Sequence, residues 1–198
     1  MKLKQLEIAL QKIEGFKKPS AELEQYMTPA PLAARFLFTA YMAGDIEGLR
    51  VADLGCGTGM LSAGAALLGA DVIGVDCDLS ALAFAKSNAE TLGVSLELIN
   101  SKIDENFICE ADTVIMNPPF GAQNVHADRP FIDAALNSAE VVWGIFNKGS
   151  FDFIKSYSKG KAEITNKVSA MLNIPKQFEF HTKENLEIPV EIVRLERY

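Results

Sequence analysis

Short apolar runs alternate with longer segments of helical periodicity between residues 49 and 146. Strands are expected at residues 49–54, 71–76, 95–100, 113–116 and 140–146, and helices at residues 59–68, 79–92 and 128–138. Strands that alternate with helices usually pair in parallel, because each helix carries the chain back across one face of the sheet. This alternation predicts an α/β fold with a largely parallel sheet.

The last third of the sequence adds two longer β segments. Residues 151–157 have a helical pattern, and residues 162–172 and 188–195 then follow as strands. Two such strands can pair as a hairpin and add an antiparallel strand to a parallel sheet. The expected fold class is therefore Rossmann-like, with a mostly parallel seven-stranded sheet, one antiparallel edge strand and helices on both faces.

The beginning of the sequence has the pattern of a helical extension. An amphipathic helix is predicted by the spacing of four apolar residues, Leu3, Leu6, Leu10 and Ile13. Ser20 is expected to cap a short helical piece. Thr28 is then predicted to be the N-cap, and Pro29 the first residue, of a helix that continues over residues 30–43.

The composition is that of a globular domain. Hydrophobic residues make up 48% and charged residues 23% of the 198 residues, so we expect one domain over residues 1–198 with residues 1–45 as its N-terminal helical extension. No apolar run approaches the ~18–20 residues that span a bilayer, and the N-terminus lacks the apolar stretch of a signal peptide. A cytoplasmic protein without membrane contact is expected.

The three cysteines do not form a recognisable framework. Cys56, Cys77 and Cys109 match no zinc spacing, and their odd number argues against a set of disulfides. We expect small buried thiols and no metal site. Cys56 and Cys77 are also placed to line a pocket, because each stands beside a candidate ligand-binding residue.

A glycine-rich loop follows the first strand of the alternating region. Residues 51–59 read Val-Ala-Asp-Leu-Gly-Cys-Gly-Thr-Gly, and the next helix begins directly after them. Glycines allow a sharp turn and leave no Cβ in the way of a ligand, while the helix start offers free N–H groups. Asp53 ends the strand, at the edge of the sheet where such folds bind ligands.

The acidic residues around this loop limit the kinds of ligand that it can bind. The spacing G-x-G-x-G differs from the dinucleotide pattern G-x-G-x-x-G, and Asp53 would repel a pyrophosphate. A methionine-derived ligand with an ammonium and a sulfonium suits an acidic loop better. Asp76 ends the second strand 19 residues after Gly57, near the spacing at which a carboxylate accepts both hydroxyls of a ribose.

The fourth strand runs into Asn117-Pro118-Pro119-Phe120, across the expected crevice from the glycine loop. Two prolines fix φ and remove two N–H donors, so the backbone there is stiff and offers only carbonyl acceptors. The Asn117 side-chain oxygen and the Pro118 carbonyl can each accept one hydrogen of an exocyclic amine. This would localise the amine lone pair for methylation through positioning and electrostatics, and Phe120 can stack on a flat base.

These segments resemble the class I S-adenosylmethionine-dependent methyltransferases that methylate amino groups. More narrowly, the chain is similar to the methyltransferase-like family that makes N6-methyladenosine in small-subunit ribosomal RNA, including its archaeal members. The likeness covers nearly the whole sequence and is carried by residues 24–29, 53–62, 114–121 and 126–131.

The resemblance implies S-adenosylmethionine as cofactor and assigns residues to the two ligands. The cofactor would be contacted by Gln25, Tyr26, Thr28, Asp53, Gly55, Cys56, Gly57, Thr58, Gly59, Met60, Asp76 and Cys77. The substrate amine would be contacted by Asn117, Pro118, Pro119 and Phe120. The family has an acidic residue after the third strand, near the cofactor adenine; here Asp104 takes that role only if the register shifts.

Two other functions fit the same residues. Glutamine amide N-methyltransferases also use Asn-Pro-Pro with an aromatic residue, usually tyrosine, but carry an extra N-terminal helical domain. A catalytically idle RNA-binding assembly factor is the third alternative, against which the intact Asn117, Asp53 and Asp76 argue. Eukaryotic family members pair with a small zinc-binding activator, and an apolar edge strand could accept such a partner by strand addition.

The charge balance is unusual for an RNA enzyme. The formal net charge is −7, whereas nucleic-acid binders usually draw affinity from basic surfaces. RNA binding would then need a local basic patch, a partner, or RNA already folded around protein. His126 is either a substrate contact or an exposed loop residue, Trp143 is expected in the core, and Phe178 with Phe180 forms either a hairpin core face or an RNA surface.

Overall fold

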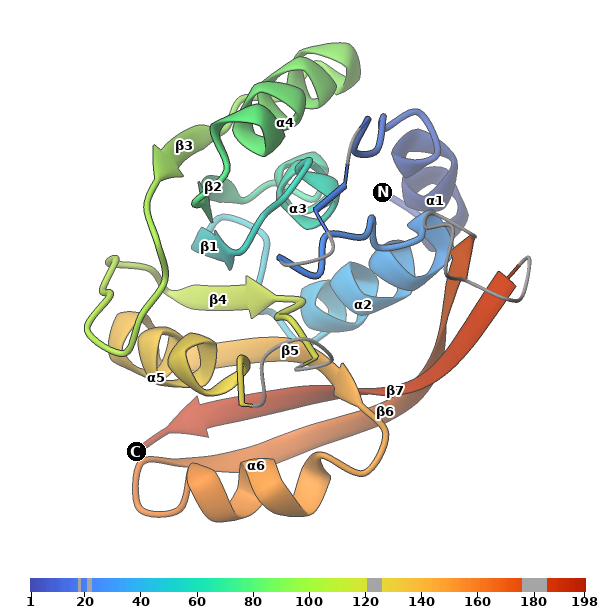
Figure 1. Cartoon of the computed structure of the whole chain (residues 1–198). Helices are drawn as coiled ribbons and strands as arrows, with labels where there is room; N and C mark the ends of the chain where they lie inside the picture. Colours follow the sequence, from blue (N-terminus) through green and yellow to red (C-terminus); the bar gives the residue numbers. More distant parts are fainter. Residues whose placement is uncertain (18, 21–22, 121–125, 176–184) are drawn as a thin grey trace.

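We describe residues 1–17, 19–20, 23–120, 126–175 and 185–198 in a computed structural model of the chain. Phe178 and Phe180 lie outside the described residues. The sheet has seven strands in the order β3-β2-β1-β4-β5-β7-β6 (Figure 1). Their bounds are β1 Arg50–Leu54, β2 Asp71–Asp76, β3 Glu97–Asn100, β4 Thr113–Met116, β5 Val141–Asn147, β6 Ala162–Pro175 and β7 Asn185–Arg197.

The predicted Rossmann-like sheet is confirmed. Strands β1 to β5 pair in parallel, and β7 runs antiparallel to both β5 and β6. The reversed strand β7 therefore lies one place in from the edge, and β6 forms the edge itself. The two hairpin strands extend beyond the predicted ranges because they pair with each other along their lengths.

Helices cover both faces of this sheet (Figure 1). Their bounds are α1 Leu3–Leu10, α2 Ala30–Met42, α3 Met60–Leu67, α4 Leu79–Leu92, α5 Arg129–Ser138 and α6 Phe151–Tyr157. Helices α1, α2 and α3 share one apolar cluster with β4 and β5, and α4 contacts α3 on that side. Helices α5 and α6 pack a second cluster against the opposite face. Among the described residues, no helix is long and apolar enough to cross a membrane.

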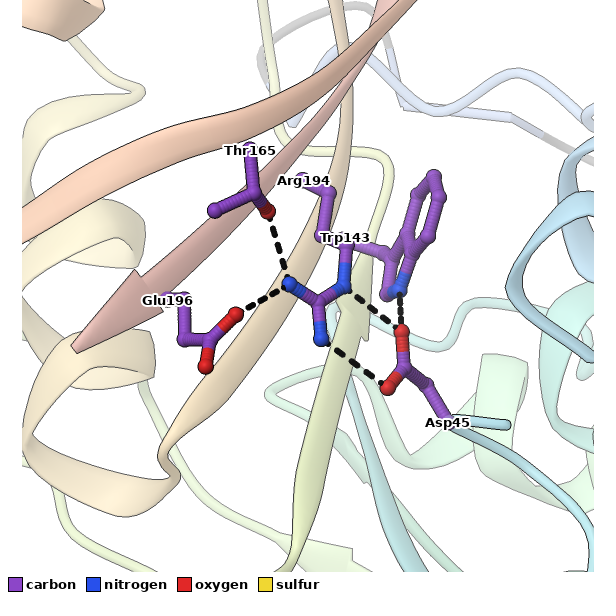
Figure 2. A network of polar contacts seen from close by, with 5 residues as sticks. All are labelled: Asp45, Trp143, Thr165, Arg194 and Glu196. Atoms are coloured by element: carbon purple, nitrogen blue, oxygen red, sulfur yellow. Dashed lines mark hydrogen bonds and ion pairs between the residues drawn. The ribbon is translucent and has the colours of Figure 1, made fainter. Parts of the chain in front are cut away.

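A polar network connects the loop after α2 to strands β5, β6 and β7 of the sheet. The carboxylate of Asp45 accepts hydrogen bonds from Trp143 Nε1 at 2.7 Å and from Arg194 Nε at 2.8 Å. Arg194 also donates to Thr165 and Glu196 (Figure 2). Trp143 is completely buried, so its predicted core position is confirmed. Burial of an indole requires a partner for its N–H, and Asp45 supplies one.

Two local predictions, for Thr28 and Cys77, were wrong. Pro29, not Thr28, occupies the N-cap of α2, and no side chain caps that helix; the Thr28 hydroxyl instead contacts Asn117. Ser20 Oγ accepts a hydrogen bond from the Leu23 backbone N–H, as an N-cap would, but residues 21–22 of the predicted short helical piece lie outside the described residues. Cys77 is exposed rather than buried, because it follows β2 at the open carboxyl edge of the sheet.

Candidate functional site

The strand order places two loops on either side of one crevice. Strands β1 and β4 are neighbours, and the chain moves from β1 toward β2 on one side and from β4 toward β5 on the other. Loops that leave such neighbouring strands diverge and open a crevice at their carboxyl ends. The glycine loop follows β1 and the Asn-Pro-Pro-Phe corner follows β4, so the two predicted motifs meet at this edge.

The glycine loop needs its glycines for both conformation and space. Gly55, Gly57 and Gly59 have φ angles of 76°, 54° and 86°, a region that side chains rarely adopt. A Cβ on Gly55 would lie 3.0 Å from the Phe131 ring, and a Cβ on Gly57 would lie 3.0 Å from the Phe16 ring. The predicted sharp turn is confirmed, and its backbone packs directly beneath two aromatic side chains.

Asp53 is a buried carboxylate with one unused oxygen. Its side chain is 1% exposed, and Oδ2 accepts a hydrogen bond from Ser62 Oγ at 2.6 Å. Oδ1 is buried without a hydrogen-bond partner in the described structure. Burial raises the pKa of Asp53 to about 7, although the Ser62 hydroxyl acts in the opposite direction. An ammonium group in the crevice would pair with the charged form and relieve the burial penalty.

Asp76 is fixed by backbone donors at the end of β2. Its Oδ2 accepts from the Gly57 N–H at 2.8 Å, and its Oδ1 accepts from the Asp78 N–H at 2.9 Å. Burial raises the pKa of this carboxyl, and the backbone hydrogen bonds partly offset that effect. Each carboxylate oxygen has a second lone pair, so both remain able to accept a ligand hydroxyl.

The N-terminal extension crosses the crevice and orients Asn117. The Asn117 Nδ2 donates to Thr28 Oγ1 at 2.9 Å, and Asn117 Oδ1 accepts from the Tyr26 hydroxyl at 3.2 Å. Burial raises the pKa of Tyr26 far above its ordinary value, so the phenol stays protonated and donates. The amide of Asn117 is therefore held at both ends by residues that precede α2.

The same extension supports Phe120 and Gln25. The Phe120 N–H donates to Glu24 Oε2 at 2.8 Å, and the Phe120 ring lies 5.8 Å from that of Tyr26. Gln25 Nε2 donates to Asp78 Oδ2 at 2.8 Å while its Oε1 accepts from the Ser20 N–H. The extension thus connects the α4 end of the crevice to the Asn-Pro-Pro-Phe corner.

These elements enclose a cavity of about 440 Å³. Thirteen of the residues proposed from the sequence line it, namely Gln25, Tyr26, Thr28, Asp53, Gly55, Cys56, Gly57, Thr58, Met60, Asp76, Cys77, Asn117 and Pro119. Four others do not, namely Gly59, Asp104, Pro118 and Phe120. A volume of this size matches a small-molecule site.

The segment after β3 reaches the cavity through other residues than Asp104. Ser101, Lys102 and Ile103 line the cavity, whereas the Asp104 carboxylate accepts a hydrogen bond from the Asn106 N–H in a turn. The register shift that would bring Asp104 to the cavity does not occur. His126, which has a φ of 69°, is exposed and is also absent from the lining.

Sequence reasoning missed several lining residues. They are Phe16, Leu23, Glu24, Met27, Leu61, Ser101, Lys102, Ile103, Ala127, Pro130 and Phe131. Phe131 lies in residues 126–131, which carry the family resemblance, but neither it nor Phe16 was assigned a contact from the sequence. Each ring packs over a glycine of the loop. Glycines that need space above them could have indicated that aromatic side chains cover this loop.

Comparison with known proteins shows which protein family the chain resembles. Residues 32–154 match the family "Methyltransferase small domain". The rRNA N(6)-adenosine-methyltransferase METTL5 of Danio rerio is 36% identical over 98% of this chain and 98% of its own length. The protein MJ0284 of Methanocaldococcus jannaschii is 40% identical over 100% of this chain and 95% of its own.

A solved structure resembles the whole chain. The crystal structure of a candidate RNA methyltransferase, PH1948 from Pyrococcus horikoshii, has a TM-score of 0.92 and 41% sequence identity, with 100% of this chain and 98% of that chain covered. The family match extends over more than half of the chain, and the METTL5 likeness extends over almost all of it. The chain therefore belongs to the methyltransferase small domain family and, within it, to the group that includes METTL5.

Proposed function

We propose that this protein transfers a methyl group from S-adenosylmethionine to N6 of adenine in RNA, with small-subunit ribosomal RNA as its substrate. One observation carries the proposal: a rigid Asn117 amide and an unpaired Asp53 carboxylate oxygen border the same cavity. The first suits an aromatic amine, and the second suits a cationic cofactor. The relative METTL5, which matches over the full length, is an rRNA N6-adenosine methyltransferase.

The residues of the crevice fit the proposed cofactor. When bound, S-adenosylmethionine supplies a methyl group activated by a positive sulfonium. The unpaired Asp53 Oδ1 is the acceptor that its ammonium needs, and Asp76 has lone pairs left for ribose hydroxyls. Gly57 borders the cavity with bare backbone, because a Cβ there would lie 3.0 Å from the Phe16 ring. Ser101, Lys102 and Ile103, rather than Asp104, border the region after β3.

The substrate amine is proposed to bind at the corner after β4. Asn117 Oδ1 accepts from Tyr26 at present, but an amide oxygen has two lone pairs and can accept a second hydrogen. The Pro118 carbonyl is the proposed second acceptor, and Phe120 the stacking surface for the base. The residues themselves supply orientation and electrostatic stabilisation, which act without a strong general base.

The partners are proposed from the relatives and the edges of the sheet. RNA is the expected macromolecular substrate, and a base within a duplex would have to be flipped out to reach the cavity. A small zinc-binding activator could add a strand to either edge of the sheet, β3 or β6. That partner remains a prediction from the family.

Transfer of labelled methyl groups tests the proposal. The protein is incubated with labelled S-adenosylmethionine and either unmodified small-subunit ribosomal RNA or a peptide release factor. Label recovered as N6-methyladenosine supports the proposal. Label on the release factor would instead indicate glutamine methylation, and cofactor binding without any transfer would indicate an idle assembly factor. Mapping N6-methyladenosine in ribosomal RNA from cells that lack the protein then identifies the modified nucleotide.

A further inference from the structure

An arginine at the start of α5 rests on two aromatic rings of α6. The guanidinium carbon of Arg129 lies 5.4 Å from the centre of the Phe153 ring and 5.7 Å from that of Tyr157. Its Nε is buried without a hydrogen-bond partner, and no ion pair engages the side chain within the part of the chain that is described. The two rings therefore support a guanidinium whose N–H groups form no hydrogen bond with the described part of the protein.

Neither Asp128 nor Asp133, the acidic residues within four positions of Arg129 in sequence, forms an ion pair with it among the described residues. Both oxygens of Asp133 are already engaged, because Oδ2 accepts from the Tyr157 hydroxyl at 2.6 Å and Oδ1 from Lys161 Nζ at 3.0 Å. Asp128 is attracted to Arg129 without forming an ion pair with it, and burial raises the pKa of Asp128. The bond from Tyr157 to Asp133 also fixes the ring beneath the guanidinium.

Comparison with the other arginines sets Arg129 apart. Arg50 and Arg194 pair with carboxylates, and Arg197 donates to the Leu136 carbonyl. Arg35 is exposed on α2 and has no described side-chain partner. Arg129 differs from Arg35 in its position, because Ala127, Pro130 and Phe131, its neighbours in sequence, line the cavity.

We propose that the Arg129 guanidinium binds a phosphate of the RNA strand beside the target adenine, with Phe153 and Tyr157 as its support. This inference rests on the proposed function and deepens it by locating a backbone contact. A planar guanidinium can bind two phosphate oxygens at once, and packing against rings holds it ready to do so. A chain with a net charge of −7 needs such local cations to hold RNA.

The test measures RNA binding without relying on methyl transfer. Binding of a short fluorescent single-stranded RNA with one adenine is titrated at several salt concentrations, since a phosphate contact is independent of sequence. Arg129→Gln should raise the dissociation constant about tenfold and reduce the slope of log affinity against log salt by about one. Its affinity for S-adenosylmethionine should stay unchanged, because Arg129 does not line the cavity.

Two further variants separate a phosphate contact from loss of structure. Arg129→Lys keeps the charge but loses the planar fork, so the salt slope should persist while affinity falls only part of the way. Arg35→Gln removes the same charge from the helix layer on the other face of the sheet and should bind RNA as the wild type does. The phosphate site is wrong if Arg129→Gln and Arg35→Gln give the same affinity and the same slope.

The two proposals fail in different ways. If the wild type methylates RNA adenine while Arg129→Gln keeps its KM for RNA and its RNA affinity, the phosphate site is wrong and the proposed function stands. If the wild type transfers no methyl group to RNA but binds it through Arg129, the proposed function is wrong and the phosphate site stands.

Discussion

The side-chain nitrogen of Asn117 donates a hydrogen bond to the hydroxyl of Thr28 at 2.9 Å, across 89 residues of sequence. Because the nitrogen is held in this way, the amide oxygen is the atom left for the Tyr26 hydroxyl and for a substrate amine. Thr28 is 6% exposed and also lines the cavity. The hydroxyl thus connects the N-terminal extension to the atom that we propose accepts the substrate.

Removal of this hydroxyl should slow turnover more than it weakens cofactor binding. Thr28→Val keeps the shape of the side chain but removes the acceptor of Asn117 Nδ2, so that only the Tyr26 hydroxyl still orients the amide. Small misplacements of a positioning group can cost about tenfold or more in kcat. Thr28→Ser, which retains the hydroxyl, should restore most of the rate. Steady-state kinetics and a cofactor titration check this; a valine variant that loses only cofactor affinity would assign Thr28 to the cofactor alone.

Asn117 itself should be needed for turnover and dispensable for cofactor binding. Asn117→Ala removes the proposed amine acceptor, and loss of one such preorganised group typically lowers kcat by about 10²–10³. The dissociation constant for S-adenosylmethionine should remain within about twofold, because Asp53 and Asp76 are untouched. Asn137→Ala, at an exposed asparagine on α5, is the matched control. Normal turnover in Asn117→Ala would refute the assigned role.

Cofactor affinity should fall as the solution becomes acidic. Burial raises the pKa of Asp53 to about 7, so in the free protein the carboxyl takes up a proton as the pH drops below that value. A cationic ligand prefers the carboxylate, and affinity should therefore decrease up to about tenfold for each pH unit below 7. Titrations between pH 5.5 and 7.0 keep an ordinary α-amino group, whose pKa is about 7.7–8.0, mostly protonated.

The control for this pH effect is Asp53→Asn. The amide cannot ionise, so the variant should bind S-adenosylmethionine weakly and with little change across the same pH range. Asp76→Ala should also weaken cofactor binding but leave a pH dependence, because Asp53 is still present. An unchanged pH profile in Asp53→Asn would show that another group controls the affinity.

The alternation of strands and helices predicted most of the fold because each element is encoded locally. The periodicity of the apolar residues and the positions of the glycines predicted the bounds of β1, β2, α4 and β4 to within one residue. The prediction of Thr28 as an N-cap failed for a long-range reason. Its hydroxyl contacts Asn117, and a partner 89 residues away leaves no mark on local sequence. The full lengths of β6 and β7 likewise depend on their mutual pairing.

The sequence predicted the parts of the candidate site in which a short motif supplies the polar side chains. Asp53, Asp76 and Asn117 each lie at or within one residue of the carboxyl end of a strand of the parallel sheet, and such ends meet at one edge. Phe16 and Phe131 could not be predicted in the same way, because only the packing of separate segments brings them over the glycine loop. Asp104 was placed by analogy with the family, and the local turn directs its carboxylate to Asn106 instead.

The network around Asp45 should be a large contributor to stability. Asp45 is 7% exposed and accepts from Trp143 and from Arg194 (Figure 2), and the hydrogen bonds to Asp45 raise the pKa of the Arg194 guanidinium. Asp45→Ala would remove the acceptor of the Trp143 N–H and one of the two carboxylates that pair with Arg194, while Glu196 and Thr165 stay bound to the guanidinium. Removal of one partner of a buried ion pair costs about 3–5 kcal/mol when the other charge is left unpaired, so the loss here should lie toward the lower end of that range.

Urea unfolding measures this cost. Asp45→Ala should lower the midpoint of unfolding without changing the slope m, which would indicate a loss of stability in the same folded state. Arg50→Ala is the control, because Arg50 pairs with Asp71 and Glu97 at exposed positions, and exposed ion pairs contribute about 0–1 kcal/mol each. Equal losses in the two variants would contradict the large stabilising role that we assign to the buried network around Asp45.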